Sequence, residues 1–385
     1  MTNPSIDDKP VTPRLLLDVD RMTRNIQTLE ARLANLGVPI RPHVKTCKSI
    51  DIARRMMAEN SPGITVSTLA EAEYFFDHGI DDQLYAVGIA PGKLERIAEL
   101  YSRGLELKLV LDSVASARRI ADAAGTLGCH FAVLLEIDAD GQRGGFRPDD
   151  AELVDAADAL VDAGCRVPGV MTHMGASYDC RDTECLTRSA ERERLSVVSA
   201  ARHLRRAGHQ CPVVSVGSTP TATFAARMEG VTEVRAGTHV FMDLVMAGLG
   251  VCRIKDIAIS VLTEVIGYRE QAGEWLVDAG WMALSRDRGT ASQQIDYGYG
   301  LVCDEQGQVI DDIIVRAASQ EHGILARRSG AGIAPDRFRI GQQLRILPNH
   351  ACATAAQHDG YWLIGQGLPD QDRDVQRYWP RMHGW

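Results

Sequence analysis

The clearest candidate for covalent chemistry is a lysine at the end of an apolar run. Residues 38–44 have the apolar, β-branched character of a strand, and the chain then continues into Lys45. His43 shares a face with Lys45, because alternate residues of an extended chain point the same way. We expect Lys45 to be desolvated, which would favour a neutral amine that can form a Schiff base with a carbonyl compound. The spacing alone is also compatible with a surface lysine that begins a helix.

Two short segments rich in glycine and hydroxyl groups follow later strand-like runs. They contain Gly217, Ser218 and Thr219 in one segment, and Arg235, Gly237 and Thr238 in the other. A phosphate group needs backbone N–H groups and hydroxyls with little steric crowding, and small residues provide both. We therefore expect a phosphate to bind there, although two ordinary tight turns would contain the same residues.

Further side chains suited to ligands stand in loops. Arg143 lies among glycines, where its guanidinium could reach an anionic oxygen, and Tyr178 follows another strand-like run. His350 and Cys352 stand two positions apart after a later run, where we expect an extended backbone to point both side chains the same way. Imidazole with thiolate favours zinc. Two ligands are a weak signal, since a half-buried histidine beside a buried cysteine gives the same pattern.

These candidates fall at the ends of strands in a repeating pattern. Helix-like stretches separate eight apolar runs, at residues 38–44, 64–68, 83–87, 107–113, 130–138, 166–173, 212–218 and 233–241. This alternation predicts an α/β fold of the (β/α)8 barrel type, whose active sites lie at the C-terminal ends of the strands. A doubly wound open sheet is the structural alternative.

The pattern changes after residue 248, where strand-like runs with glycine-rich turns follow one another without long helices. These runs lie at residues 257–268, 274–278, 308–317 and 343–347. We therefore expect a barrel over residues 20–248 and a mainly β domain over residues 1–19 and 249–385, which carries the candidate metal pair. A short strand at residues 14–19 is expected to join the β domain.

Composition narrows the class of protein. The 385 residues are 45% hydrophobic and 24% charged, as in globular proteins, and the net charge of −9 argues against nucleic acid as a partner. We find no signal peptide and no apolar stretch of membrane-spanning length, and expect a cytoplasmic protein without membrane association. The nine cysteines are odd in number and lack a framework spacing, so we expect free thiols in a reducing compartment.

Taken together, these segments resemble a known family. The residues are Arg-Pro-His-Val-Lys-Thr at 41–46, Gly-Ser-Thr-Pro-Thr at 217–221, Arg-Ala-Gly-Thr at 235–238 and His-Ala-Cys at 350–352. They are similar to the fold-type III pyridoxal-phosphate enzymes of the D-serine dehydratase and D-threonine aldolase group. The resemblance extends over nearly the whole chain and includes residues 64–68, 278–282 and 320–324.

The resemblance implies an alanine-racemase-like barrel, a C-terminal β domain and a homodimer. It implies that Lys45 carries pyridoxal 5'-phosphate, and that His350 and Cys352 hold a divalent metal beside the substrate hydroxyl. Zinc is the expected metal, with manganese or another ion as alternatives. Other cofactor contacts are expected from His43, Arg143, Tyr178, Arg235 and the two small-residue segments.

The metal pair also indicates a reaction. Aldolases of the group tend to carry His-x-Asp where this chain has His-x-Cys, as the dehydratases do. The resemblance therefore implies a lyase that eliminates water from small D-3-hydroxy amino acids, such as D-threo-3-hydroxyaspartate or D-serine, and releases a 2-oxo acid and ammonia. A metal-dependent D-threonine or D-3-hydroxyaspartate aldolase is the first alternative, followed by an amino-acid racemase and a non-catalytic cofactor carrier.

Overall fold

The computed structural model describes residues 11–142, 144–366 and 378–385. The chain forms two compact units. One consists of Thr23–Val240, Leu249–Val251 and Met382–Trp385. The other consists of the described residues within Met1–Met22, Phe241–Gly248 and Cys252–Arg381.

The first unit contains eight parallel strands in a nearly closed barrel. They are β2 (Ile40–Pro42), β3 (Ile64–Val66), β4 (Asp82–Gly88), β5 (Glu106–Leu111), β6 (Ala132–Ile137), β7 (Arg166–Thr172), β8 (Val213–Val216) and β9 (Glu233–Ala236). Hydrogen-bonded neighbours follow the order β2-β9-β8-β7-β6-β5-β4-β3. A parallel bridge between His43 and Thr65 joins the ends of this order. The predicted barrel is confirmed, and the open doubly wound sheet is wrong.

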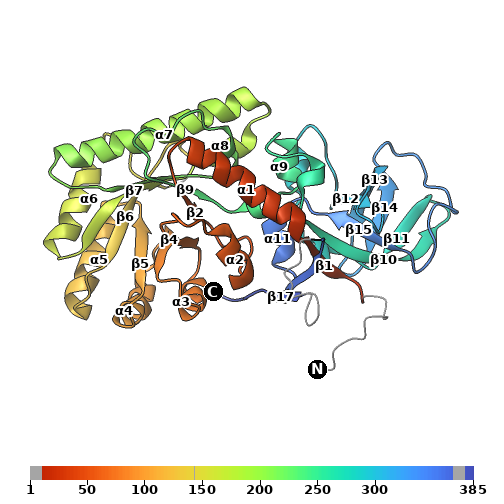
Figure 1. Ribbon diagram of the computed structural model, residues 1–385, viewed down its shortest axis with the longest axis horizontal. Helices are drawn as coiled ribbons and strands as arrows, with labels where there is room; N and C mark the ends of the chain where they lie inside the picture. The colour runs from red at the N-terminus through yellow and green to blue at the C-terminus, as the bar shows by residue number, and fades with distance from the viewer. Residues whose placement is uncertain (1–10, 143, 367–377) are drawn as a thin grey trace. The chain divides into compact units, whose positions relative to one another are not determined.

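Helices connect these strands and lie on their outer side (Figure 1). They are α2 (Ile50–Met56), α3 (Leu69–Asp77), α4 (Leu94–Ser102), α5 (Val114–Leu127), α6 (Ala151–Asp162), α7 (Thr183–Arg206) and α8 (Thr219–Phe224), and α1 (Val19–Asn35) precedes them. The side chains of Thr68, Ser113, Asp150 and Asp182 each accept a hydrogen bond from a backbone N–H in the first turn of the next helix. These caps fix where each loop enters its helix.

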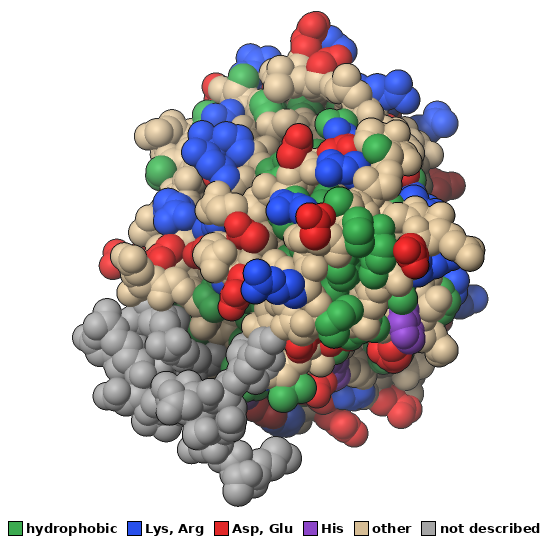
Figure 2. All heavy atoms as spheres, turned by 90° about the vertical axis from the view of Figure 1, so that its right-hand side faces the viewer, with side chains coloured by type: hydrophobic (Ala, Val, Ile, Leu, Met, Phe, Trp, Pro, Cys, Tyr) green, Lys and Arg blue, Asp and Glu red, His purple; other side chains and the backbone are tan. Residues whose placement is uncertain are grey.

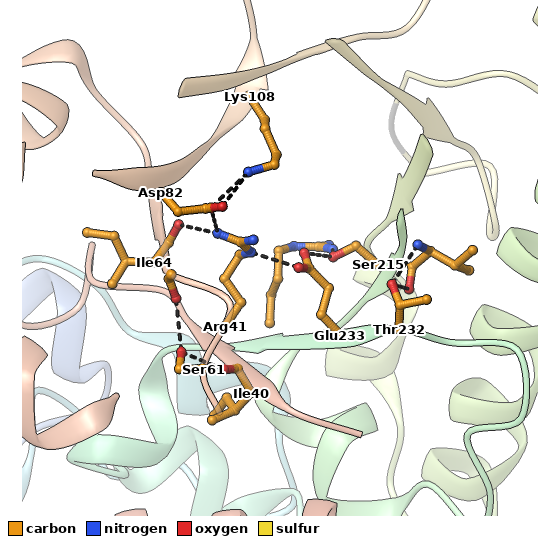
Figure 3. A network of polar contacts seen from close by, with 12 residues as sticks. Ile40, Arg41, Ser61, Ile64, Asp82, Lys108, Ser215, Thr232 and Glu233 are labelled. Carbon is orange, nitrogen blue, oxygen red and sulfur yellow. Dashed lines mark hydrogen bonds and ion pairs between the residues drawn. The ribbon is translucent and has the colours of Figure 1, made fainter. Parts of the chain in front are cut away.

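An ion network, buried at Arg41 and Glu233 and partly exposed at Asp82, connects strands of the barrel (Figure 3). Arg41 of β2, only 2% exposed, donates from Nε to Glu233 of β9 at 2.8 Å and from Nη1 to Asp82 of β4 at 2.6 Å. Lys108 of β5 donates to both oxygens of Asp82 at 2.8 Å. Because each charge has an opposite partner, the cost of burying it is largely offset, and strands far apart in sequence are held together.

The second unit is built on a mixed β-sheet. Its strands are β1 (Arg14–Asp18), β10 (Ile259–Arg269), β11 (Glu274–Val277), β12 (Leu301–Cys303), β13 (Val309–Ala318), β14 (Gly323–Arg327), β15 (Gln343–Leu347), β16 (Gly360–Ile364) and β17 (Tyr378–Pro380). Strand β1 pairs antiparallel with β10 and parallel with β16, so the N-terminal strand belongs to this sheet. The sequence did not predict β12, β14, β16 and β17, although β11 and β15, which are similarly short, were predicted.

On the face shown in Figure 2, acidic and basic side chains are interspersed, and a small group of hydrophobic side chains lies among them. On this face the net negative charge of the chain is therefore not gathered into a single acidic area. Within the described ranges, no helix combines the length and the apolar character that a membrane span requires.

One expectation about the cysteines is wrong. Cys180 and Cys185 form a disulfide, with their Cα atoms 5.5 Å apart. They flank Asp182, the residue that caps α7 and turns the chain into the helix. The odd number of cysteines excludes complete pairing, but it does not exclude one local pair.

Protein purified without reductant is therefore expected to show seven reactive thiols when it is unfolded, and nine after reduction. Alkylation followed by intact-mass measurement counts them. Cys185→Ser should give eight thiols without any reduction, because it releases Cys180. Nine thiols in the untreated wild-type protein would contradict the pairing.

Candidate active site

The barrel unit has an open cavity where the C-terminal ends of its strands meet. Its walls include nine of the residues predicted from the sequence: His43, Lys45, Tyr178, Gly217, Ser218, Thr219, Arg235, Gly237 and Thr238. The tenth predicted cofactor contact, Arg143, lies outside the described residues. Residues from strands far apart in sequence thus meet in one place, as the barrel fold requires.

Lys45 lies three residues beyond the end of β2 and lines this cavity. Its side chain is exposed, so the expectation of a desolvated lysine is wrong. The reason is that the chain has already left the barrel when it reaches Lys45. What distinguishes this lysine from others on the surface is its place among the cavity residues, and not its burial.

His43 lies closer to the barrel interior than Lys45. Its Nδ1 is buried and has no hydrogen-bond partner among the described residues. Burial and the nearby side chains of Lys45, Arg235 and His173 lower the pKa of His43 well below the usual histidine value. The imidazole is therefore neutral near pH 7.

The glycines of the two small-residue segments permit close approach of neighbouring strand ends. A Cβ atom on Gly217, which has a φ of +140°, would lie 2.0 Å from the carbonyl oxygen of Arg235. A Cβ atom on Gly237 would lie 2.7 Å from the carbonyl oxygen of His43. Glycine at position 217 therefore lets the loop after β8 approach β9, and glycine at position 237 lets the loop after β9 approach the segment that carries His43 and Lys45. A phosphate would fit beside them without side-chain crowding.

Arg235 is held rigidly in the wall of the cavity. Its guanidinium donates to the hydroxyl of Ser215 at 2.5 Å and to the carbonyl oxygen of Thr172. The same hydroxyl donates to Glu233 at 2.7 Å, and Glu233 accepts from Arg41 (Figure 3). A chain of buried contacts thus connects the ion network of the barrel to the cavity.

In the second unit, the candidate metal pair lies between β15 and the short helix α11 (Ala351–Ala355). His350 is the N-cap residue with an extended backbone, whereas Cys352 lies in the first turn of the helix. The expectation that both residues stand on one face of an extended chain is therefore wrong. Their side chains nevertheless hydrogen-bond each other. Asp243 accepts a hydrogen bond from the N–H of Ala351 at 2.9 Å and so holds the peptide between them.

The surroundings of His350 favour a cation. Its Nδ1 lies 2.6 Å from a carboxylate oxygen of Asp287. Although burial opposes the charged ring, the hydrogen bonds to Asp287 and Cys352 raise the pKa of His350 to about 11. With Nδ1 engaged by a carboxylate, Nε2 is oriented as in many metal-binding histidines. The donor set therefore fits a metal ion.

The pair by itself would not complete a coordination shell. Among the described residues, no group of three or more His, Cys, Asp or Glu side chains is arranged to hold a metal. Two protein ligands would leave coordination positions for water or substrate, which suits a catalytic metal better than a structural one.

The sequence and structure were compared with known proteins. A family model described as the alanine racemase N-terminal domain matches residues 17–245, which is more than half of the chain. The chain belongs to this family. A second model, described as a putative serine dehydratase domain, matches residues 258–364.

Proteins that resemble this chain along its length include dehydratases. The D-threo-3-hydroxyaspartate dehydratase of Delftia sp. (strain HT23) is 52% identical over 377 residues, which cover 97% of this chain and 98% of that protein. The D-serine dehydratase of Dictyostelium discoideum is 29% identical over 392 residues, 97% of each chain. A solved cysteine-to-alanine mutant of D-threo-3-hydroxyaspartate dehydratase, described as metal-free, has a TM-score of 0.94 and 51% identity over 98% of both chains. The resemblance seen in the motifs is confirmed.

Five further residues line the cavity of this family member but were not predicted: Ala86, Glu136, Met171, His173 and Ala236. His173 is the most informative, because its Nδ1 lies 2.8 Å from the carbonyl oxygen of Gly217 and its ring centroid lies 6.4 Å from that of Tyr178. Alternation along the strands could have identified two of the five. Glu136 and His173 each stand two residues after a side chain of the barrel core, Leu134 and Met171.

Proposed function

We propose that this protein is a dehydratase dependent on pyridoxal phosphate and a divalent metal, which converts D-3-hydroxy amino acids to 2-oxo acids and ammonia. The observation that carries the proposal is the cavity that combines Lys45 with the loops at Gly217 and Gly237. Such a cavity provides an amine for a carbonyl compound and uncrowded space for a phosphate. The dehydratases similar over the whole chain support the same function.

Different residues of the cavity would hold different parts of the cofactor. Lys45 would hold its aldehyde carbon as a Schiff base. The segments at 217–219 and 237–238 would hold its phosphate. The rigid guanidinium of Arg235 and the aromatic rings of His173 and Tyr178 would orient its ring. Pyridoxal phosphate supplies an electron sink that stabilises a carbanion at the substrate Cα.

Lys45 would also act as a base. Its amine would remove the proton from Cα of the substrate. His43 remains neutral beside it, because its pKa is lowered by burial and by neighbouring charges, and so it adds no positive charge that would oppose protonation of the lysine.

His350 and Cys352 would hold the metal, with Asp287 orienting the imidazole. The metal supplies a Lewis acid that makes the β-hydroxyl a better leaving group. Zinc suits a histidine–cysteine pair best, and manganese or another ion is the alternative. The description of a similar dehydratase structure as metal-free supports a metal site in such dehydratases. A homodimer in the cytoplasm remains a prediction.

A product assay tests the reaction. Incubation with D-threo-3-hydroxyaspartate, D-serine and D-threonine should release ammonia and a 2-oxo acid in equal amounts, with oxaloacetate from the first substrate and pyruvate from the second. Cleavage of the Cα–Cβ bond would instead yield glycine and an aldehyde. Glycine as the main product from all three would contradict the dehydratase and identify an aldolase.

A further inference from the structure

A single buried carboxylate joins two loops of the cavity to the helix that covers them. Glu193 of α7 is 1% exposed. Its Oε1 accepts hydrogen bonds from the N–H of Met174, just after β7, at 2.9 Å and from the N–H of Gly217, just after β8, at 3.3 Å. The hydroxyl of Thr221, in the first turn of α8, also bonds to this carboxylate. One side chain therefore fixes three points around the segment 217–221.

The contacts of Glu193 differ in kind from those of the acidic residue nearest to it on the helix. Glu191 is partly exposed and forms ion pairs with Arg194 and Arg227. Glu193 takes part in no ion pair among the described residues, and its partners are two backbone amides and a hydroxyl. Burial raises the pKa of Glu193, and the hydrogen bonds from Thr221 and Met174 counter this effect. Burying a carboxyl group costs free energy because the group loses its contacts with water. Its presence here indicates that the hydrogen bonds it makes to the loops are needed.

The segment that Glu193 holds is the one that would contact phosphate. Gly217, Ser218 and Thr219 line the cavity, while the N–H of Gly217 points away from it towards Glu193. Gly217 also has a φ of +140°, so its backbone conformation is not one that most residues would maintain. Fixing this amide and the Thr221 hydroxyl sets the direction of the intervening residues.

We propose that Glu193 is a positioning residue for the cofactor phosphate: it holds the loop at 217–221 in the shape that receives the phosphate before the cofactor binds. This inference rests on the proposed function. It concerns the phosphate end of the cofactor and not the lysine linkage, so the two can be tested separately.

The test compares two ligands that differ only in the phosphate. Binding of pyridoxal phosphate and of pyridoxal to cofactor-stripped protein is titrated through the visible absorption of the Schiff base. Glu193→Ala should lower the affinity for pyridoxal phosphate by at least about tenfold. It should change the affinity for pyridoxal much less. Glu193→Gln keeps an acceptor for the two amides and a donor for Thr221, so it should bind both ligands nearly as the wild type does. Glu191→Ala, the same deletion on the same helix, should change neither affinity.

Glu193→Asp provides a second route if the alanine variant does not fold. It keeps the charge but withdraws the carboxylate by one methylene, and it should also lose affinity for pyridoxal phosphate selectively. Two outcomes in whichever of these variants folds would overturn the inference. An equal loss of affinity for both ligands would indicate a general structural role, and unchanged affinity for both would indicate no role. A wild-type protein that forms no Schiff base with either ligand would overturn the proposed function, and this inference with it.

Discussion

Replacement of Lys45 by alanine is expected to abolish the visible absorption band of the bound cofactor and to lower the dehydratase rate by on the order of 10³-fold or more. Both effects have the same cause, because the lysine amine is proposed to hold the cofactor and then to remove the Cα proton. The variant should fold normally, since the side chain is exposed and supports no packing. Absorption spectra and rates of ammonia release measure the two effects.

Lys48→Ala is the matched control. Lys48 lies three residues further along the same segment and forms an ion pair with Glu71 at 3.1 Å, but it does not line the cavity. Its replacement should leave the absorption band in place. Borohydride reduction followed by peptide mapping should place the cofactor on Lys45 in the wild type. A label on another lysine, or a band that survives in Lys45→Ala, would show that the assignment is wrong.

The sequence predicted the barrel and most of the cavity because both depend on local patterns. Apolar runs bounded by polar turns located all eight strands, and the ends of those strands supplied the candidate residues. The fold then brought residues as distant as Lys45 and Gly237 into one cavity. In the second unit, β12, β14, β16 and β17 were missed, whereas the similarly short β11 and β15 were predicted.

Features that depend on packing could not be predicted in the same way. Glu193 lies in the run Glu-Arg-Glu-Arg at 191–194, which suggests a solvated helix face, yet the structure buries it against two loops. Lys45 was expected to be desolvated, but its exposure depends on where the chain leaves the barrel. The local pairing of Cys180 with Cys185 depends on the turn that Asp182 caps, and counting cysteines does not detect it.

The metal site has one part that the local sequence pattern predicted and one part that depends on packing. The residue types and their spacing identified His350 and Cys352, but the assumed extended backbone is replaced by a helix start at Ala351. Asp287, which orients the imidazole, lies 63 positions earlier in the chain, and no local motif connects it to His350. The chemistry of the ligands was therefore predictable, whereas the residue that positions one of them was not.

Removal of the metal is expected to stop elimination without releasing the cofactor. Treatment with a chelator should lower the rate of ammonia release by about a hundredfold or more, because a Lewis acid supplies several kcal/mol to the departure of the hydroxyl. The visible absorption band should persist, since the metal is assigned to the substrate and not to Lys45. Cys352→Ala should reproduce both results and should bind less than one equivalent of metal by elemental analysis.

The controls separate loss of the metal from loss of a thiol. Cys129→Ala removes a cysteine from the barrel unit and should keep both metal and activity. Cys352→Asp supplies a carboxylate in place of the thiolate, so it should recover part of the metal binding and shift the products towards glycine, as the His-x-Asp pair of the aldolases suggests.

Because the metal is proposed to assist departure of the hydroxyl and not removal of the Cα proton, exchange of that proton with deuterated solvent should continue in Cys352→Ala. Full elimination by metal-free Cys352→Ala would refute the role of the metal in this reaction.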